Sequence, residues 1–413
     1  MIRLFREHGL IAGLLLLKAI QTVEGAIAST TAMIVLNYTI IIVMLFYIVR
    51  NFAPGNKSNY RIIGIYLLWM LTAGAIRGGF VAETREEMMD LITGIALSTI
   101  PIIAYVMSSP KMLWKTLHLW IWFALPLFIV YYSWKIPLSS YQFFFGPMFL
   151  ICFIPILPNK WKIILSVIVL IMFAGDFGAR SQSLKAAVVI LICMGYYFRR
   201  WIPVMFYHAV HWLCYIGPVI ILYFAITGVF NPLEKMEDYQ NDALYEGEED
   251  LTADTRSYLY EETIQSAVKN DYIWCGRSLA RGNDSWVFEA FTDEQLKTKR
   301  YERYGNEWCH PNVFTWLGLI GVILYALMYL TSSYLALYKS NNIWMKFLSL
   351  FIAYNWMWGW LENCLEFNIL NIGLWMMIAM GFSEEFRAMS DKEIETWVKS
   401  LFKWKYEKDS VAE

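Results

Sequence analysis

Residues 28–49 read ASTTAMIVLNYTIIIVMLFYIV, and they decide the fold class because no charged side chain interrupts them. A helix needs about 20 mostly apolar residues to cross the hydrocarbon core of a bilayer. Similar runs recur along the chain of 413 residues, of which 58% are hydrophobic and only 17% are charged. Because soluble domains carry about a quarter charged residues, the composition predicts an all-α, polytopic membrane protein.

The apolar runs predict about twelve transmembrane helices. The first run is the weakest because Lys18 interrupts it, so it either spans the membrane or lies at the interface. The predicted spans are residues 9–22, 28–49, 62–76, 91–107, 117–134, 140–157, 163–174, 184–198, 206–230, 313–338, 343–361 and 369–382.

The charges of the connections between these runs alternate along the chain. One set of connections holds thirteen basic residues and a single acidic residue, Glu7. The intervening set carries acidic residues such as Glu24, Glu83, Asp176 and Glu362. Since basic residues near span ends mark the cytoplasmic side, we expect both termini in the cytoplasm and the acidic connections outside.

This topology divides the chain into four parts. Residues 1–230 hold the first nine spans, residues 231–310 form one large outside loop, residues 311–382 hold three further spans, and residues 383–413 form a cytoplasmic tail. The tail is either an amphipathic helix that rests on the lipid surface or a solvated segment. In the first case Leu401, Phe402 and Trp404 contact lipid.

The outside loop contains 18 acidic and nine basic residues between positions 231 and 309. Its first third is the most acidic and is expected to be solvated. Apolar spacing of three and four predicts an amphipathic helix at 254–269, and a second short helix is expected at 293–304. The loop is also rich in aromatic residues, which pack a small core or stack on sugar rings.

Two arginines of the outside face are candidate anion ligands. Arg180 lies in the tight turn Gly-Asp-Phe-Gly-Ala-Arg-Ser at 175–181, at a membrane boundary where a charge is costly unless it reaches water, pairs or functions. Arg256 lies in the first turn of the predicted loop helix, where the helix dipole disfavours a cation. Each is either a surface charge or half of a diphosphate clamp, because a guanidinium binds phosphate oxygens with two donors.

His310 stands in Cys-His-Pro-Asn at 309–312, directly before a predicted span. Pro311 suits the first position of a helix, so the imidazole is expected at the helix start, where the dipole opposes its protonation. A neutral imidazole there is either an ordinary interfacial side chain or a general base. Further candidates for substrate binding are Arg77, Arg277, Arg281, Trp274 and Trp308.

These pieces together resemble the O-antigen ligase and O-antigen polymerase family. The resemblance covers roughly residues 176–321 and rests on Ala-Arg-Ser at 179–181, Thr-Arg-Ser at 255–257, Trp-Cys-Gly at 274–276, and His310 followed by Gly318-Leu-Ile-Gly321. The family usually has Asn directly after His, whereas Pro311 intervenes here. It often has an acidic residue before the Gly pair, and this chain has none.

The resemblance implies a metal-independent glycosyltransferase of the GT-C class in a bacterial inner membrane, with the large loop in the periplasm. Such enzymes move a glycan from an undecaprenyl diphosphate carrier to an acceptor glycan or glycolipid at the outer leaflet. It implies Arg180 and Arg256 as diphosphate ligands and His310 as general base, without cofactor, metal or nucleic acid. Polymerase and ligase activities are nearly equal alternatives, and polymerase is preferred.

Two other classes remain open on the sequence. A transporter or flippase usually has paired broken helices and internal repeats, and no clear repeat is visible here. A receptor would use the outside loop only for binding. Among the six cysteines, Cys275 and Cys309 share the outside loop, where they either remain thiols or form a disulfide. No cysteine spacing resembles a zinc site.

Overall fold

The computed structural model describes residues 2–23, 30–51, 57–127, 152–174, 180–226, 257–285 and 301–403. These residues are mostly helical, with one short antiparallel pairing of β1 (Asn283–Asp284) and β2 (Glu302–Arg303). The helices are α1 (Ile2–Val23), α2 (Thr30–Asn51), α3 (Lys57–Trp69), the π-helical turn η2 (Met70–Ile76), α4 (Arg77–Val81), α5 (Arg85–Ser98), η3 (Ile100–Ile102), α6 (Ile103–Val106), α7 (Pro110–Leu119), η4 (Trp120–Ala124), η6 (Ile154–Ile156), α10 (Asn159–Ala174), α11 (Arg180–Phe198), α12 (Val204–Ile226), α14 (Ser257–Lys269), α16 (Cys309–Tyr338), α17 (Ile343–Trp358), α18 (Ile369–Phe382), α19 (Glu384–Ala388) and α20 (Asp391–Ser400).

Five helical stretches of the described residues are long and apolar enough to cross a membrane. This supports the predicted class, an all-α membrane protein. The number of twelve spans stays a prediction, and the sixth expected span, at 140–157, lies mostly outside the described residues. The five stretches are Thr31–Asn51, Ser58–Val81, Arg85–Val106, Val204–Ile221 and Cys309–Tyr338, and shorter apolar helices lie at His8–Gln21, Ala186–Phe198 and Ile369–Phe382.

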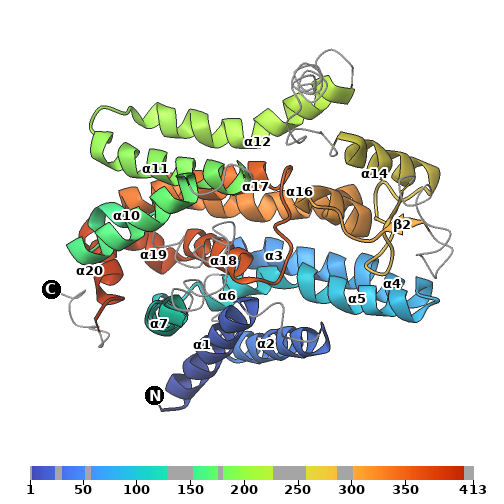
Figure 1. Cartoon of the computed structure of the whole chain (residues 1–413), viewed down its shortest axis with the longest axis horizontal. Coiled ribbons are helices and arrows are strands. Elements are labelled where there is room, and N and C mark those ends of the chain that lie inside the picture. The colour runs from blue at the N-terminus through green and yellow to red at the C-terminus, as the bar shows by residue number, and fades with distance from the viewer. Residues whose placement is uncertain are drawn as a thin grey trace, which may run out of the picture.

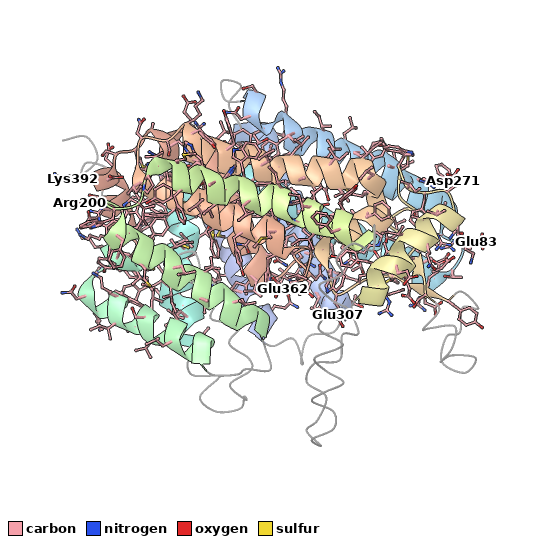
Figure 2. All side chains as sticks on the ribbon, turned by 90° about the horizontal axis from the view of Figure 1, so that it is seen from above. Glu83, Arg200, Asp271, Glu307, Glu362 and Lys392 are labelled. Atoms are coloured by element: carbon pink, nitrogen blue, oxygen red, sulfur yellow. The ribbon has the colours of Figure 1, made fainter. Side chains whose placement is uncertain are left out.

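The long helices run broadly along the longest axis of the molecule (Figure 1). Helix α16 is central, since it packs against α17, α18 and α3. Helix α14 and the small sheet lie at one end beside α4, and α20 and the C-terminus lie at the other end (Figure 1). Figure 2 shows Glu83 and Asp271 at the first end and Arg200 and Lys392 at the second, which agrees with the charge alternation of the sequence.

Polar side chains at the helix starts fix where these elements begin. The Asn342 side chain accepts the Met345 N–H at the start of α17, and Asn368 accepts the Asn371 N–H at the start of α18. Thr84 and Glu87 form a reciprocal capping box on α5. Such caps satisfy the N–H groups that have no partner inside the helix.

The C-terminal tail differs from the expectation of a lipid-resting or solvated segment. Leu401 is fully buried, and its carbonyl oxygen lies 2.8 Å from Nδ1 of His118 in α7. Trp397 donates its indole N–H to the Pro110 carbonyl, and Phe402 stacks on Trp161. The apolar face of α20 therefore packs on the bundle, while Trp404 lies outside the described residues.

The outside loop agrees with one predicted helix and contradicts part of the other. Helix α14 (Ser257–Lys269) covers the described part of the helix expected at 254–269. Residues 301–304 of the helix expected at 293–304 are instead extended, because β2 pairs with β1 in the register Asn283 to Arg303. The remaining residues of that segment lie outside the described ranges.

Candidate functional site

Helix α16 is interrupted within the predicted span. Gly318 has φ 69° and ψ −172°, which breaks the helix into two parts. The N–H groups of Leu319 and Ile320, freed by the break, donate to the carbonyl oxygens of Ile273 and Trp274 at 2.8 and 3.3 Å. Residues of the predicted outside loop thus accept the hydrogen bonds that the broken helix cannot make internally.

The carbonyl side of the same break is also satisfied by protein groups. Arg277 donates its backbone N–H to the Thr315 oxygen at 2.6 Å, and the Trp69 indole donates to the Leu317 oxygen at 2.9 Å. A Cβ atom on Gly318 would lie 2.2 Å from the Trp274 oxygen, so only glycine fits. We call residues 273–277 together with Gly318 the junction, because it fastens the outside loop to α16.

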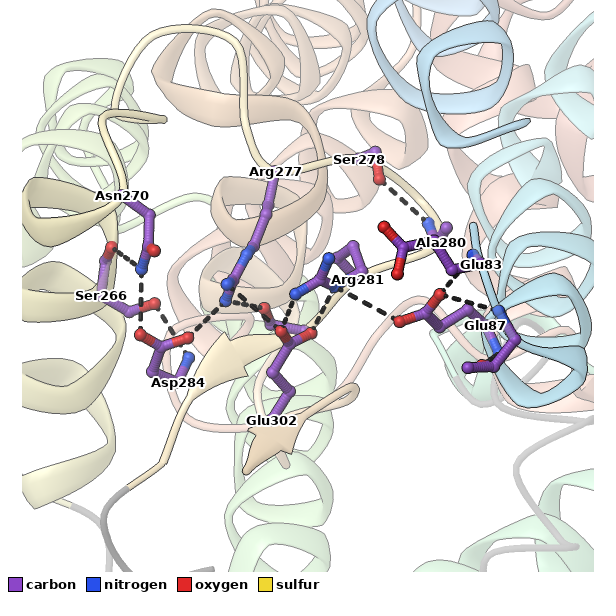
Figure 3. A network of polar contacts seen from close by, with 12 residues as sticks. Glu83, Glu87, Ser266, Asn270, Arg277, Ser278, Ala280, Arg281, Asp284 and Glu302 are labelled. Carbon is purple, nitrogen blue, oxygen red and sulfur yellow. Dashed lines mark hydrogen bonds and ion pairs between the residues drawn. The ribbon is translucent and has the colours of Figure 1, made fainter. Parts of the chain in front are cut away.

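Two of the predicted substrate-binding arginines are occupied by ion pairs beside the junction (Figure 3). Arg281 binds Glu302 with two nitrogens, and this hydrogen bonding raises the pKa of its guanidinium further. Arg277 donates to Asp284 at 2.6 Å and also pairs with Glu302 at 3.2 Å. Because these guanidiniums already bind carboxylates, they hold the loop together rather than offering a free anion site.

The carboxyl group of Asp284 shows how this network stabilises charge. Burial acts to raise its pKa, but hydrogen bonds from Asn270 and Arg277 outweigh burial and hold the pKa below its ordinary value. Lys269 adds an ion pair at 3.2 Å. The loop elements 257–285 and 301–308 therefore form one cross-linked unit, which we call the cap.

Arg77 and Trp274, two further candidates, remain accessible at the cap end. Arg77 donates Nη1–H to the Gly276 oxygen at 2.7 Å, and the residue is otherwise exposed. Trp274 is 63% exposed, and Phe80 on the adjacent α4 is 87% exposed. A cation beside exposed aromatic rings at the end of an apolar helix suits an anionic lipid headgroup.

Trp308, in contrast, is buried in this structure, so its role as a substrate contact stays a prediction. Its side chain is 1% exposed, and its ring centroid lies 4.3 Å from that of Tyr260. It belongs to the packed base of the cap, where α14 contacts α16.

The connection between α17 and α18 lies between the two ends of the molecule and not at either end (Figure 2). Helix α17 has 16 residues and α18 has 14, which at 1.5 Å per residue span roughly 24 and 21 Å, less than the roughly 30 Å of a hydrocarbon core. Figure 2 accordingly places Glu362 between the two ends of the molecule, away from the end that carries Glu83. We call residues 359–368 the recessed loop.

The recessed loop carries two carboxyl groups in different surroundings. Glu362 is half-buried and accepts the Trp358 indole N–H at 2.7 Å. Glu366 is exposed and accepts a hydrogen bond from the Asn368 amide at 2.6 Å. The protein around Glu366 raises the pKa of its carboxyl, chiefly by desolvation, and the charge of Glu362 adds to this rise.

His310 supports the recessed loop from the buried side. It donates its backbone N–H to the Gly359 oxygen at 3.3 Å, and its Nε2 lies 2.9 Å from the Trp356 oxygen. The ring packs 4.0 Å from Trp356 and 4.7 Å from Trp360, and the residue is only 2% exposed. The imidazole is therefore enclosed, with Nε2 donating to a carbonyl oxygen, and its role as general base stays a prediction.

The cap also contacts the recessed loop directly. Tyr260 of α14 donates its hydroxyl to the Trp360 oxygen and stacks on the Trp360 ring. Burial raises the pKa of the Tyr260 phenol, so the hydroxyl stays a donor. Arg256 precedes Tyr260 by four positions in the sequence and lies outside the described residues.

Arg180 is the first residue of α11, and only its backbone is described. Near the other end of α11, Tyr196 stacks on Trp344 at the beginning of α17, with ring centroids 4.5 Å apart. The two helices therefore run in opposite directions, and α11 begins on the side where α17 ends. Figures 1 and 2 agree in placing the start of α11 toward the recessed loop.

The sequence analysis did not identify this recessed loop as a candidate site. Glu362 and Glu366 were used only as topological markers, although two carboxylates between unusually short apolar helices are a visible signal. Lys18 is also close: its ammonium lies 5.8 Å from the Phe367 ring and donates to Gln21 at 2.7 Å. Across the described ranges, no group of three or more His, Cys, Asp or Glu side chains is arranged to hold a metal ion.

No protein-family model, curated protein or solved structure matches this chain.

Proposed function

We propose that this chain is a membrane glycosyltransferase. It transfers an oligosaccharide from an undecaprenyl diphosphate carrier to a hydroxyl group of an acceptor glycan, and polymerisation of lipid-linked units is its preferred form. The observation that carries the proposal is the exposed Glu366 on a recessed loop between two short apolar helices. An ionisable side chain at that depth marks a functional site unless it is paired inside the protein.

In this proposal Glu366 is the general base. It accepts the proton of the acceptor hydroxyl while the oxygen attacks the anomeric carbon and the bond from that carbon to the diphosphate breaks. A carboxyl whose pKa is raised by its surroundings is a better base than an ordinary one. Asn368 orients the carboxylate through its amide.

The diphosphate leaving group takes negative charge, which guanidinium groups stabilise without proton transfer. Arg180 and Arg256 keep this role as proposed ligands. The start of α11 lies toward the recessed loop, and Arg256 precedes the helix whose Tyr260 is bonded to that loop. Arg77 is proposed as a first contact for the lipid-linked donor at the cap end, because it is exposed beside Trp274.

His310 has a different role in this proposal from the one that the resemblance implies. Its ring is enclosed by Trp356 and Trp360, and its Nε2 is bonded to a backbone carbonyl. We therefore propose His310 as a positioning residue for the recessed loop. Its substitution acts through Glu366 and alters the pH dependence of transfer as well as its rate.

The test uses the full-length protein in liposomes with an undecaprenyl-diphosphate-linked oligosaccharide. We expect wild-type protein to lengthen the lipid-linked glycan and Glu366→Gln to lose transfer by about 100-fold or more, the usual range for a general base. Glu307→Gln is the matched control, since Glu307 is an exposed carboxylate in the neighbouring segment 301–308. Full transfer by Glu366→Gln, or none by wild type with any acceptor, contradicts the proposal.

The same assay separates polymerase from ligase. A ladder of products formed from the lipid-linked unit alone indicates polymerisation. Transfer only after addition of a lipid A core acceptor indicates ligation. Both outcomes keep the glycosyltransferase proposal and differ in the acceptor.

The break in α16 favours a second candidate, a transporter, because transporters bind substrates at broken helices. In those proteins the unwound backbone groups are left for the substrate or ion. Here the Thr315 and Leu317 oxygens already accept hydrogen bonds from the protein, which weighs against this candidate. Movement of the intact lipid-linked glycan across the liposome bilayer, without any change in glycan length, is the result that supports transport.

A further inference from the structure

The start of α16 and the recessed loop meet at two cysteines. Cys309 donates its backbone N–H to the Glu362 oxygen at 3.0 Å. The Cys364 sulfur lies 3.8 Å from the same oxygen. The two residues are therefore neighbours in space although 55 positions separate them in the sequence.

Both side chains are free thiols in this structure. Both residues are buried, at 0% and 4% exposure. A disulfide needs Cβ atoms about 3.5–4.5 Å apart, and two cysteines that contact the same carbonyl oxygen need little backbone movement to approach each other.

We infer that Cys309 and Cys364 form a disulfide that ties the start of α16 to the recessed loop. The Cys309 thiol loses its proton to water, and its thiolate attacks a sulfur of an external protein disulfide and releases the other sulfur as a thiolate, which takes up a proton. Cys364 then attacks the Cys309 sulfur and releases the second thiol, so two thiols are oxidised while one donor disulfide is reduced. Because both sulfurs are buried in the finished fold, the exchange takes place before α16 packs on the loop.

This pairing replaces the one considered from the sequence. Cys275 is exposed at the junction, whereas Cys309 is enclosed with Cys364. The inference rests on the proposed outside location of the cap end, where an oxidising compartment permits disulfides. It does not depend on glycan transfer, so the thiol measurement and the transfer assay fail independently.

The experiment counts thiols in the full-length protein taken directly from membranes. The protein is denatured in detergent without reductant and treated with N-ethylmaleimide, and adducts are counted by intact mass. Six cysteines with one disulfide give four adducts in wild type. Removing one partner frees the other, so Cys364→Ser and Cys364→Ala each give five.

Cys275→Ser is the matched control, since it removes an exposed cysteine outside the pair. It gives three adducts if Cys309 and Cys364 are bonded. Five adducts with Cys275→Ser and three with Cys364→Ser indicate the other pairing and overturn the inference. Six adducts in wild type overturn it as well.

A second measurement uses the buried position of the bond. In the folded protein, dithiothreitol leaves the count at four, and after denaturation it raises the count to six. A count of six after mild treatment of folded protein shows that the reactive pair is exposed, which contradicts this assignment.

Discussion

The junction and the recessed loop are both irregular backbone within an apolar bundle, and they differ in what happens to their polar groups. At the junction, the Leu319 and Ile320 N–H groups and the Thr315 and Leu317 oxygens all have protein partners. At the recessed loop, Glu366 is exposed and the buried indole N–H of Trp360 has no hydrogen bond. Irregular backbone at membrane depth persists only where protein or water satisfies it.

This difference separates an irregularity that holds the fold together from one that we propose to be functional. The π-helical turn η2 and the broken helix α16 would each suggest a site when considered alone. Their hydrogen bonds are instead used to hold the cap. The recessed loop keeps polar groups that a substrate can use, so the predictions that follow test structure at the junction and chemistry at the loop.

The largest expected effect is that of Gly318→Ala. A left-handed conformation costs a non-glycine residue about 1–2 kcal/mol, and overpacking adds about 1–3 kcal/mol. The added Cβ meets the backbone of Trp274 at 2.2 Å, where no side chain can move aside. We expect a loss of about 2–5 kcal/mol, measured by thermal unfolding of the purified protein in detergent.

Gly79→Ala is the matched control for this substitution. Gly79 lies in α4 near the same end of the molecule, and nothing lies within 4 Å of an added Cβ. Alanine is a better helix former than glycine by about 1 kcal/mol, so the melting temperature of Gly79→Ala should equal or exceed that of wild type. Equal melting temperatures for both variants would show that the junction does not carry the stability assigned to it.

The next effect in size concerns Arg281→Ala in the cap. The Arg281 side chain, which binds Glu302 through two nitrogens, is 14% exposed. Hydrogen bonds to charged groups contribute about 1.5–3 kcal/mol. Arg277 still neutralises Glu302 after the change, so we expect about 2 kcal/mol rather than the larger cost of an unpaired buried charge.

Limited proteolysis of the cap and thermal unfolding measure this loss. Lys269→Ala is the control, because its pair with Asp284 involves a side chain that is 75% exposed, and such pairs contribute at most about 1 kcal/mol. If cap cleavage by protease is as slow in Arg281→Ala as in wild type, the network does not hold the cap together.

Much of the helical framework could be predicted from the sequence because it depends on local composition. Uninterrupted apolar runs such as the one in α2 (Thr30–Asn51) identify membrane helices without any knowledge of their neighbours. The spacing of apolar residues also predicted α14 (Ser257–Lys269). The extended residues 301–304 were missed because their pairing with residues 283–285 joins distant segments.

The candidate site was less accessible to sequence reasoning. The break at Gly318 depends on partners about 40 positions earlier, and a glycine in a span does not by itself indicate a break. The burial of His310 arises from Trp356 and Trp360, which come from the next helix and the loop after it. Local sequence places the imidazole at a helix start, and only tertiary packing shows that its ring is covered.

A smaller effect is expected for Tyr260→Phe, which probes the contact between the cap and the recessed loop. The change removes the hydroxyl that donates to the Trp360 oxygen and leaves the ring stacking in place. One neutral hydrogen bond contributes about 1 kcal/mol, so a small decrease in melting temperature is expected. Tyr334→Phe, at a position 41% exposed, should leave it unchanged. Equal changes in melting temperature for the two variants would show that the hydrogen bond from Tyr260 to the recessed loop does not stabilise the protein.

The smallest effect is a difference in how two carboxyl groups respond to acid. The pKa of Asp284 lies below its ordinary 3.8 in the folded protein, so its contribution to stability is present above that value and is lost as the pH falls further. The pKa of Glu366 lies above its ordinary 4.5, so the ionised form is disfavoured by folding and the proton returns at a higher pH.

Acidification should therefore reduce glycan transfer, through protonation of Glu366, while the cap is still folded. Transfer rate and melting temperature measured on one pH series check this order, and Arg277→Gln should move only the loss of stability, to higher pH. If transfer rate and melting temperature fall over the same pH range in wild type, the carboxyl groups of the recessed loop and the cap do not differ as their polar contacts indicate.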